Sequence, residues 1–291
     1  MATSELNRPA GLPAARLQLP GRAWIRHRNL LGELVRRDLK SRYRGSNLGV
    51  LWSLFNPLLY MIIYSIVFSL FMRVRVVGAP YPVYLLSGLL CYNFLSQALT
   101  GSCQSILANA SIVTKVAFPW VLLTMSAVLA NFVNFLISLL LLVPVLLILK
   151  VPMGPSLLLL PVVLAILFML AMGLGLVVAA ANVYFRDVEH LLGIILQLGF
   201  FMTPIIYSLS TITDLITGKN GTTSTRAELF YGVIRLNPMT WVVGASQDVL
   251  AFHRAPQHWQ GLLYAAVLSL VALGVGIRVF NRLQSHFAEE L

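Results

Sequence analysis

The chain has 291 residues, of which 58% are hydrophobic and 11% charged, and its mean hydropathy is +0.82. This composition excludes an ordinary soluble domain and indicates a membrane protein. The net charge of +11 would suit a nucleic-acid partner, but ten of the 21 Lys and Arg residues precede residue 45, where they indicate membrane topology instead.

The N-terminal part is predicted to lie on the cytoplasmic side. Residues 1–23 are rich in Pro, Ala and Arg, with no cleavable signal peptide, and we expect a cytoplasmic tail. Residues 24–44 are predicted to form an amphipathic helix in the membrane interface. Asp38 and Arg42 fall on its apolar face at i,i+4 spacing. They form either a surface pair or a pair that meets another protein surface, and the sequence leaves both open.

Six transmembrane helices are predicted, and the fold class is all-α. A basic segment leads directly into the first apolar run, so the chain crosses from the cytoplasm and both termini are cytoplasmic. This topology places 14 Lys and Arg inside and seven outside. Residues 208–258 are an external segment with short helices around Asn237 and Pro238. The spans are at about 50–72, 83–101, 120–149, 157–181, 191–207 and 259–277.

Several spans carry patterns that predict helix packing. Asn131, Asn134 and Ser138 share one face and are expected to form hydrogen bonds between helices, with a substrate site as the alternative. Small residues recur at i, i+4 and i+8 in the fourth span, at Ala171, Gly175 and Ala179, which favours close approach of a neighbouring helix. The two cysteines, Cys91 and Cys103, match no metal spacing and are interpreted as apolar fillers.

The sequence disfavours several chemistries. No acidic residue occurs between residues 76 and 185, so an intramembrane enzyme or a proton-coupled carrier lacks its ionisable groups. No phosphate-binding loop of the GxxxxGK[ST] type is present, and no metal site is predicted. If ATP drives transport, the ATPase must be a separate chain.

Motifs along the chain carry a resemblance to a known family. They are similar to the membrane subunit of type-2 ABC exporters of surface polysaccharides, which includes O-antigen (Wzm-like), teichoic-acid (TagG-like), capsule and galactan exporters. The resemblance implies a homodimer with two ATPase subunits that hold ATP and Mg, and a polyprenyl-linked glycan substrate in the inner membrane of a bacterium. The motifs are RDLKSRYRGSNLGVLWSLFNPL (37–58), NASIVTKVAFP (109–119), NVYFRDVEHLL (182–192), TPIIYS (203–208) and NPMT (237–240).

The resemblance also implies roles for residues at matching positions. The helix 24–44 is an interface helix beside the ATPase, through Arg37, Asp38, Lys40, Arg42 and Tyr43. Two segments are ATPase-coupling elements, with Asn109, Lys115, Phe118 and Pro119 in the first and Arg186, Asp187 and Glu189 in the second. Pro204, Tyr207, Asn237 and Pro238 are assigned to the external gate.

An aromatic stripe on the first span is the candidate substrate path. Tyr60, Tyr64, Phe68 and Phe71 recur at helical spacing and offer rings for stacking on sugars, whereas the alternative is ordinary packing or lipid contact.

The chain departs from the family pattern in two places. Trp120 and Thr124 stand where a charged residue and a proline are usual, and the loop 211–226 is longer. Rival functions are a permease for a small lipid or drug, a polyprenyl-phosphate sugar transferase, and a scaffold without transport.

Overall fold

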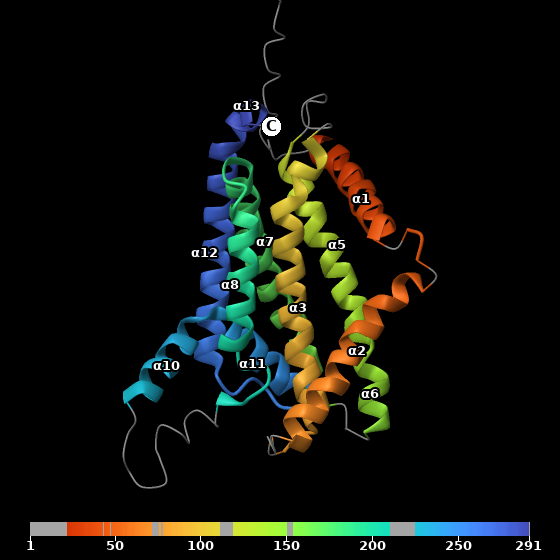
Figure 1. The fold of residues 1–291 in the computed structure, drawn as a ribbon, viewed down its shortest axis with the longest axis vertical. Helices are drawn as coiled ribbons and strands as arrows, with labels where there is room; N and C mark the ends of the chain where they lie inside the picture. The colour runs from red at the N-terminus through yellow and green to blue at the C-terminus, as the bar shows by residue number, and fades with distance from the viewer. Residues whose placement is uncertain are drawn as a thin grey trace, which may run out of the picture.

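The computed structural model describes residues 22–42, 44–46, 48–71, 76, 78–110, 119–149, 154–209 and 225–290. Within these ranges the chain forms helices and helical turns, and no strand occurs, as the all-α prediction requires. Figure 1 shows an upright bundle. The helix α1 (Arg22–Arg42) and the short α13 (Phe287–Glu290) lie at one end of it, and α10 (Thr225–Leu236) and α11 (Pro238–Leu250) lie at the other.

Five segments of the described chain are long and apolar enough to cross a membrane. The first is α2 (Trp52–Tyr64) with the π-helical turn Ser65–Phe71, and the second is α3 (Tyr81–Ser105). The third joins α5 (Val121–Leu140) to α6 (Leu142–Ile148). The fourth is α7 (Leu160–Tyr184) after the turn Pro155–Leu159, and the fifth is α12 (Trp259–Leu283). Each coincides with a predicted span.

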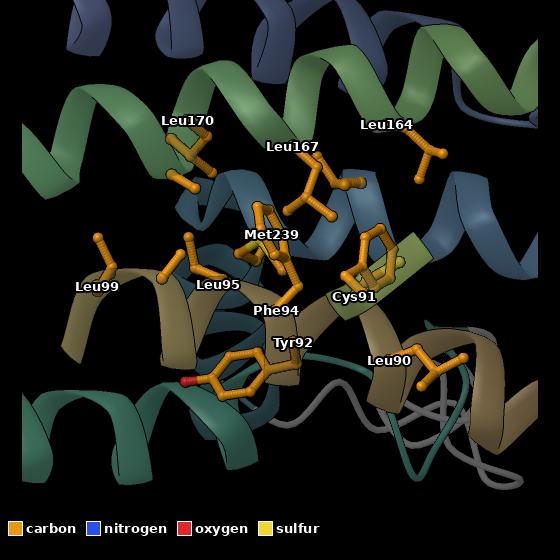
Figure 2. Packing of buried hydrophobic residues seen from close by; sticks show 14 of the residues in the cluster. Leu90, Cys91, Tyr92, Phe94, Leu95, Leu99, Leu164, Leu167, Leu170 and Met239 are labelled. Carbon is orange, nitrogen blue, oxygen red and sulfur yellow. The ribbon is translucent and has the colours of Figure 1, made fainter. Parts of the chain in front are cut away.

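The helix α3 is the centre of the bundle. In an 18-residue apolar stretch of α3, 78% of the residues are buried, against 17% in the corresponding stretch that contains α2. Figure 2 shows its apolar side chains, among them Leu95 and Leu99, on the side that faces Leu167 and Leu170 of α7. A fully buried position of this kind disfavours charge, which explains why α3 contains no ionisable acid or base apart from tyrosine and cysteine.

The predicted fifth span is shorter than expected. The helix α8 (Val188–Met202) has 15 residues and rises about 22 Å, less than the roughly 30 Å of the hydrocarbon layer. It ends because Thr203 precedes Pro204, and the proline ring drives the residue before it into an extended conformation. Thr203 has φ −100° and ψ 133° accordingly.

Two helices extend beyond their predicted ends. The helix α3 reaches Ser105 instead of residue 101, and α12 reaches Leu283 instead of residue 277. The last span is predicted to end before its charged residues. The helix itself continues through Arg278 and Arg282, whose charges are compatible with a helix that extends into water. Membrane boundaries and helix boundaries therefore differ.

The small-residue face of α7 packs as predicted. Ala171, Gly175 and Ala179 are buried. A Cβ atom built on Gly175 would lie 2.6 Å from the Ser102 hydroxyl of α3, so a larger residue there would require the Ser102 side chain to shift. The prediction of close packing at this face is confirmed. Cys91 and Cys103 are also buried thiols within α3, consistent with apolar fillers.

Candidate functional site

The helix α1 is held against α5 by apolar and charged side chains together. Leu34 is 9% exposed and Leu31 packs beside it against the bundle core. Asp38 forms an ion pair with Arg37 at 3.1 Å and accepts a hydrogen bond from the Ser126 hydroxyl of α5, also at 3.1 Å. The amphipathic character predicted for this segment is therefore confirmed, and its apolar face also carries the polar contacts of Asp38 that fix it to the bundle.

Arg42, the last residue of α1, binds two amide side chains. Its Nη1 donates to Oε1 of Gln97 on α3 at 3.1 Å, and its Nη2 donates to Oδ1 of Asn131 on α5 at 2.6 Å. The predicted pair between Asp38 and Arg42 is therefore wrong, because each charge binds other groups. An i,i+4 ion pair on a helix is worth only about 0.2–0.5 kcal/mol, whereas hydrogen bonds to charged groups are worth about 1.5–3 kcal/mol.

Loss of Arg42 and loss of Asn131 are expected to be coupled. The double variant Arg42→Ala with Asn131→Ala should lose about 1–2 kcal/mol less unfolding free energy than the sum of the single variants, because each single change strands the other group. Unfolding of the purified protein in detergent measures this. The matched cycle with Asp38→Ala and Arg42→Ala should show a smaller coupling, and equal couplings in the two cycles would contradict the assignment.

A polar cavity of about 530 Å³ opens between α1, α2, α3 and α5. Its polar groups are amides, hydroxyls, one indole and one guanidinium, and none of the described residues that line it is acidic. Such a set donates and accepts hydrogen bonds without a high fixed charge. The lining consists of Arg42, Ser46, Trp52, Ser53, Asn56, Pro57, Tyr60, Leu90, Asn93, Phe94, Gln97, Asn131, Asn134, Phe135 and Ser138.

The hydrogen bonds expected between helices are present in the wall of this cavity. The Ser53 hydroxyl of α2 donates to Oδ1 of Asn134 on α5, and the Ser138 hydroxyl donates to the Ser53 carbonyl at 3.0 Å. Together with Asn131, these residues join α2 and α1 to α5. The structural interpretation of the three α5 residues is confirmed, and the same residues also line the polar cavity.

The aromatic stripe of α2 divides into two parts. Tyr64 lies between Tyr60 and Phe68, with ring centroids 5.9 and 6.1 Å away, and it also meets Phe200 of α8 at 6.4 Å. Tyr64 and Phe68 pack against the core, as the packing alternative requires. Tyr60 instead lines the polar cavity, and Phe71 is exposed. Their role in a substrate path stays a prediction.

The second predicted coupling segment is an exposed turn between α7 and α8. Arg186 and Asp187 are exposed there. Asp187 occupies the N-cap position of α8, but its side chain makes no capping hydrogen bond. Glu189 accepts a hydrogen bond from Nε2 of Gln104 at 2.7 Å. This contact connects the turn to the last helical turn of α3.

The first coupling segment is described only at its two ends. Asn109 donates from Nδ2 to the Ser105 carbonyl at 2.8 Å, and Pro119 precedes Trp120, the N-cap residue of α5. Lys115 and Phe118 lie outside the described residues, as does Tyr43 of the predicted interface helix. The Gln104–Glu189 contact places the start of this segment beside the second one.

The predicted gate residues meet at the opposite end of the bundle. Asn237 caps α11 by accepting from the Met239 amide, and its Nδ2 donates to the Thr203 hydroxyl at 3.0 Å. Gln247 of α11 donates to the Pro204 carbonyl at 3.2 Å.

Two tyrosines of α3 form hydrogen bonds with the non-helical backbone that follows α8. The Tyr81 and Tyr84 hydroxyls donate to the carbonyls of Ile206 and Tyr207 at 3.0 and 2.9 Å. Non-helical backbone near a membrane needs such partners, because lipid supplies none.

The sequence of this chain matches a known family of membrane proteins. Residues 29–217, more than half of the chain, match the family described as ABC-2 type transporter. The chain belongs to this family. The permease is thus a membrane subunit of a transporter and not an enzyme, and the resemblance seen in the sequence motifs is confirmed.

The permease is similar to named relatives over nearly its whole length. The O-antigen export system permease protein RfbA of Myxococcus xanthus is 35% identical over 274 residues, which are 93% of this chain and 98% of that protein. The protein of the same name from Klebsiella pneumoniae is 31% identical over 268 residues, 90% and 95% of the two chains. The polysialic acid transport protein KpsM of Escherichia coli is 22% identical over 249 residues, 85% and 91%.

The permease also contains an aromatic cluster that sequence reasoning missed. The Phe287 ring of α13 stacks on Trp120 at 5.7 Å and meets Tyr184 at 6.0 Å and Phe280 at 5.5 Å. The Tyr184 hydroxyl donates to the Leu283 carbonyl at 2.9 Å. The cluster adjoins both coupling segments, because Trp120 follows Pro119 and Tyr184 precedes the exposed turn. Trp120 was noted only as a departure from the family pattern.

A second missed feature is an ion pair after α11. Asp248 is 10% exposed and binds Arg254 at 2.7 Å, and it also accepts from the Gln257 amide at 2.9 Å. Arg254 lies over the Phe252 ring at 4.3 Å. These contacts stabilise the connection between α11 and α12. The spacing of these residues in the sequence matches no recognisable motif.

Proposed function

We propose that this permease moves a lipid-linked polysaccharide, such as an O-antigen, across the cytoplasmic membrane of a bacterium. The end-to-end similarity to two O-antigen export permeases carries the proposal. The relative whose name refers to polysialic acid transport supports it. The polar cavity suits such a substrate, because its amides and hydroxyls can bind sugar hydroxyls. It also carries few fixed charges, which would otherwise bind a moving polymer too tightly.

ATP is used by a partner. An ABC permease works with a separate ATPase subunit that binds ATP and Mg. We place two such subunits at the end of the bundle that carries α1 and α13 (Figure 1). The exposed turn at Arg186 and the C-terminal end of α3, which precedes Asn109, lie at this end (Figure 1), joined by the Gln104–Glu189 contact.

A second copy of the chain belongs to the proposed assembly. The outer face of α2 exposes large apolar side chains, which suit either lipid or a second permease. They include Phe55, Leu59 and Ile63, and Ile66 in the π-helical turn that follows extends the same exposed apolar surface. A homodimer between two ATPases would give the assembly two-fold symmetry, the commonest arrangement of oligomers.

The proposed orientation places both termini in the cytoplasm. The helices α1 and α13 lie at the same end of the bundle, so the N-terminal and C-terminal helices are on one side of a membrane that the bundle spans (Figure 1). The topology predicted from the sequence assigns fourteen Lys and Arg to the cytoplasmic side and seven to the other, the bias expected for this orientation.

The exposed turn is expected to couple ATP hydrolysis to transport. Arg186→Ala and Asp187→Ala should each lower export about tenfold at unchanged ATPase rate, because a charge contact across the subunit boundary is lost. Their unfolding free energies should stay within about 0.5 kcal/mol of wild type, since both side chains are exposed and Asp187 makes no capping bond. Export by both variants at the wild-type level would refute this role.

Deletion of the gene tests the proposed function. Cells that lack the permease should lose a surface polysaccharide and accumulate its lipid-linked form inside, and the wild-type gene should restore export. A small-lipid or drug permease would leave the surface polysaccharide intact, and that outcome would overturn the proposal.

A further inference from the structure

The polar cavity is lined by residues from the end of α1 to the middle of α3. Arg42 lies at the end of α1, at the rim. Asn93 stands at the midpoint of the 25-residue α3, about 18 Å from either end. Ser138 lies 17 residues along α5, counted from Val121. Polar groups at this depth are costly unless water, protein or a ligand satisfies them.

Some lining groups are already satisfied by the protein and others are not. Asn131 and Ser138 have partners on α5, α2 and α1. The polar ends of four other side chains, Trp52, Asn56, Tyr60 and Asn93, make no hydrogen bond within the described part of the chain. These four line the same volume, so their donors and acceptors are available to an occupant of the cavity. They therefore distinguish a ligand-binding surface from the structural wall.

We propose that the polar cavity binds the headgroup of the lipid-linked glycan, that is, a phosphate and the first sugar of the chain. This inference rests on the proposed function and names the part of the substrate that this permease recognises. The cavity of about 530 Å³ is within the 300–1,000 Å³ usual for small-molecule sites. The positive charge of Arg42, with no acidic group among the described lining residues, favours an anion over a cation as the occupant.

Arg42 binds the phosphate. Its guanidinium has five N–H donors in a planar fork, and the contacts to Gln97 and Asn131 use two of them. The remaining donors suit the oxygens of a phosphate at the rim. Because the two amide acceptors already fix the guanidinium, little side-chain entropy is lost when the anion binds.

The uncharged groups bind the sugar. Asn56 and Asn93 each offer an amide that can donate and accept, as adjacent sugar hydroxyls require. Tyr60 and Trp52 provide ring faces for stacking. The lipid tail stays outside the cavity on the exposed apolar face of α2, beside Leu59. This face favours a lipid-linked sugar phosphate over a free one.

Binding to two probes tests the proposal with the purified complex of permease and ATPase in lipid nanodiscs. One probe is a short-chain polyprenyl phosphate that carries a single hexose, and the other is the same polyprenyl phosphate without sugar. The double variant Asn56→Leu with Asn93→Leu should bind the hexose probe about tenfold more weakly and the bare probe equally well, since two hydrogen bonds to the sugar are lost. Arg42→Gln should weaken both probes.

Matched variants separate recognition from folding. Trp52→Leu should reduce hexose-dependent affinity, whereas Trp259→Leu should not, although the two tryptophans are 45% and 51% exposed. The amide variants should melt no lower than wild type, because their side chains make no hydrogen bond with described residues. Unchanged hexose affinity in the amide variants would overturn the proposal for the cavity while leaving export intact. A wild-type complex that binds neither probe and exports no glycan would overturn the proposed function itself.

Discussion

Replacement of Gly276 by alanine is expected to destabilise the permease more than any surface change. The helices α7 and α12 approach so closely that a Cβ atom on Gly276 would overlap the backbone of Gly173. A Cβ atom on Gly173 would likewise overlap the backbone at Ala272. Rigid backbone cannot rotate away as a side chain can, so the helices must separate. Overpacking of this kind costs about 1–3 kcal/mol, and we expect the upper part of this range.

The control for this variant is Gly193→Ala in α8. A Cβ atom there has no neighbour within 4 Å. Alanine is favoured over glycine in a helix by about 0.8–1.0 kcal/mol, so this change should leave stability unchanged or raise it. Thermal melting and folded yield of the purified protein compare the two variants. Equal stability of Gly276→Ala and Gly193→Ala would contradict the close contact between α7 and α12.

Phe287→Ala is expected to have an effect at least as large. The ring is fully buried and meets Trp120, Tyr184 and Phe280. Truncation of a buried phenylalanine costs about 3–5 kcal/mol, here confined to the end of the bundle that carries α13. Trp120 and Tyr184 adjoin the two coupling segments, so the loss should also weaken the coupling of ATP hydrolysis to transport.

Two measurements separate these effects of Phe287→Ala. Hydrogen exchange should rise in α13 and at the start of α5, and the amount of glycan exported for each ATP hydrolysed should fall. Phe201→Ala on α8, where the ring is 60% exposed, serves as the control and should change neither. Unchanged exchange at the start of α5 would show that the cluster does not hold that helix.

The spans could be predicted because the membrane imposes a simple rule on composition. A helix must present about 20 apolar residues to cross, and the runs around Leu85, Leu123 and Leu167 do so. The amphipathic α1 and the small-residue face at Gly175 could be predicted for the same reason, since helical periodicity is local. Pro204 predicts a helix end near Thr203, but the predicted fifth span is not shortened accordingly.

Contacts between distant parts of the chain could not be predicted from periodicity. Asp38 and Arg42 looked like a pair because they are four residues apart, but Ser126 and Asn131 lie closer in space. Sequence spacing says nothing about which groups on α5 face α1. The Phe287 cluster was missed for the same reason, since its members come from three separate stretches of the chain.

The polar cavity shows both what helical periodicity can predict and what it cannot. Asn131, Asn134 and Ser138 share a helix face, so their hydrogen bonds between helices could be foreseen. That Asn56 and Asn93 line the same volume depends on how α2 and α3 cross α5, which no local pattern encodes. Helical spacing groups Tyr60 with Tyr64 in one aromatic stripe. In the structure Tyr60 lines the polar cavity, whereas Tyr64 packs against the apolar core.

Reconstituted transport tests the central claim most directly. Liposomes would contain the permease, its ATPase or both, with a labelled lipid-linked glycan in the leaflet that faces the ATPase. We predict that the glycan reaches the opposite leaflet only when both subunits, ATP and Mg are present, and that the permease alone hydrolyses no ATP. Specific ATP hydrolysis by the permease alone, or failure of the active complex to move the glycan, would contradict the account.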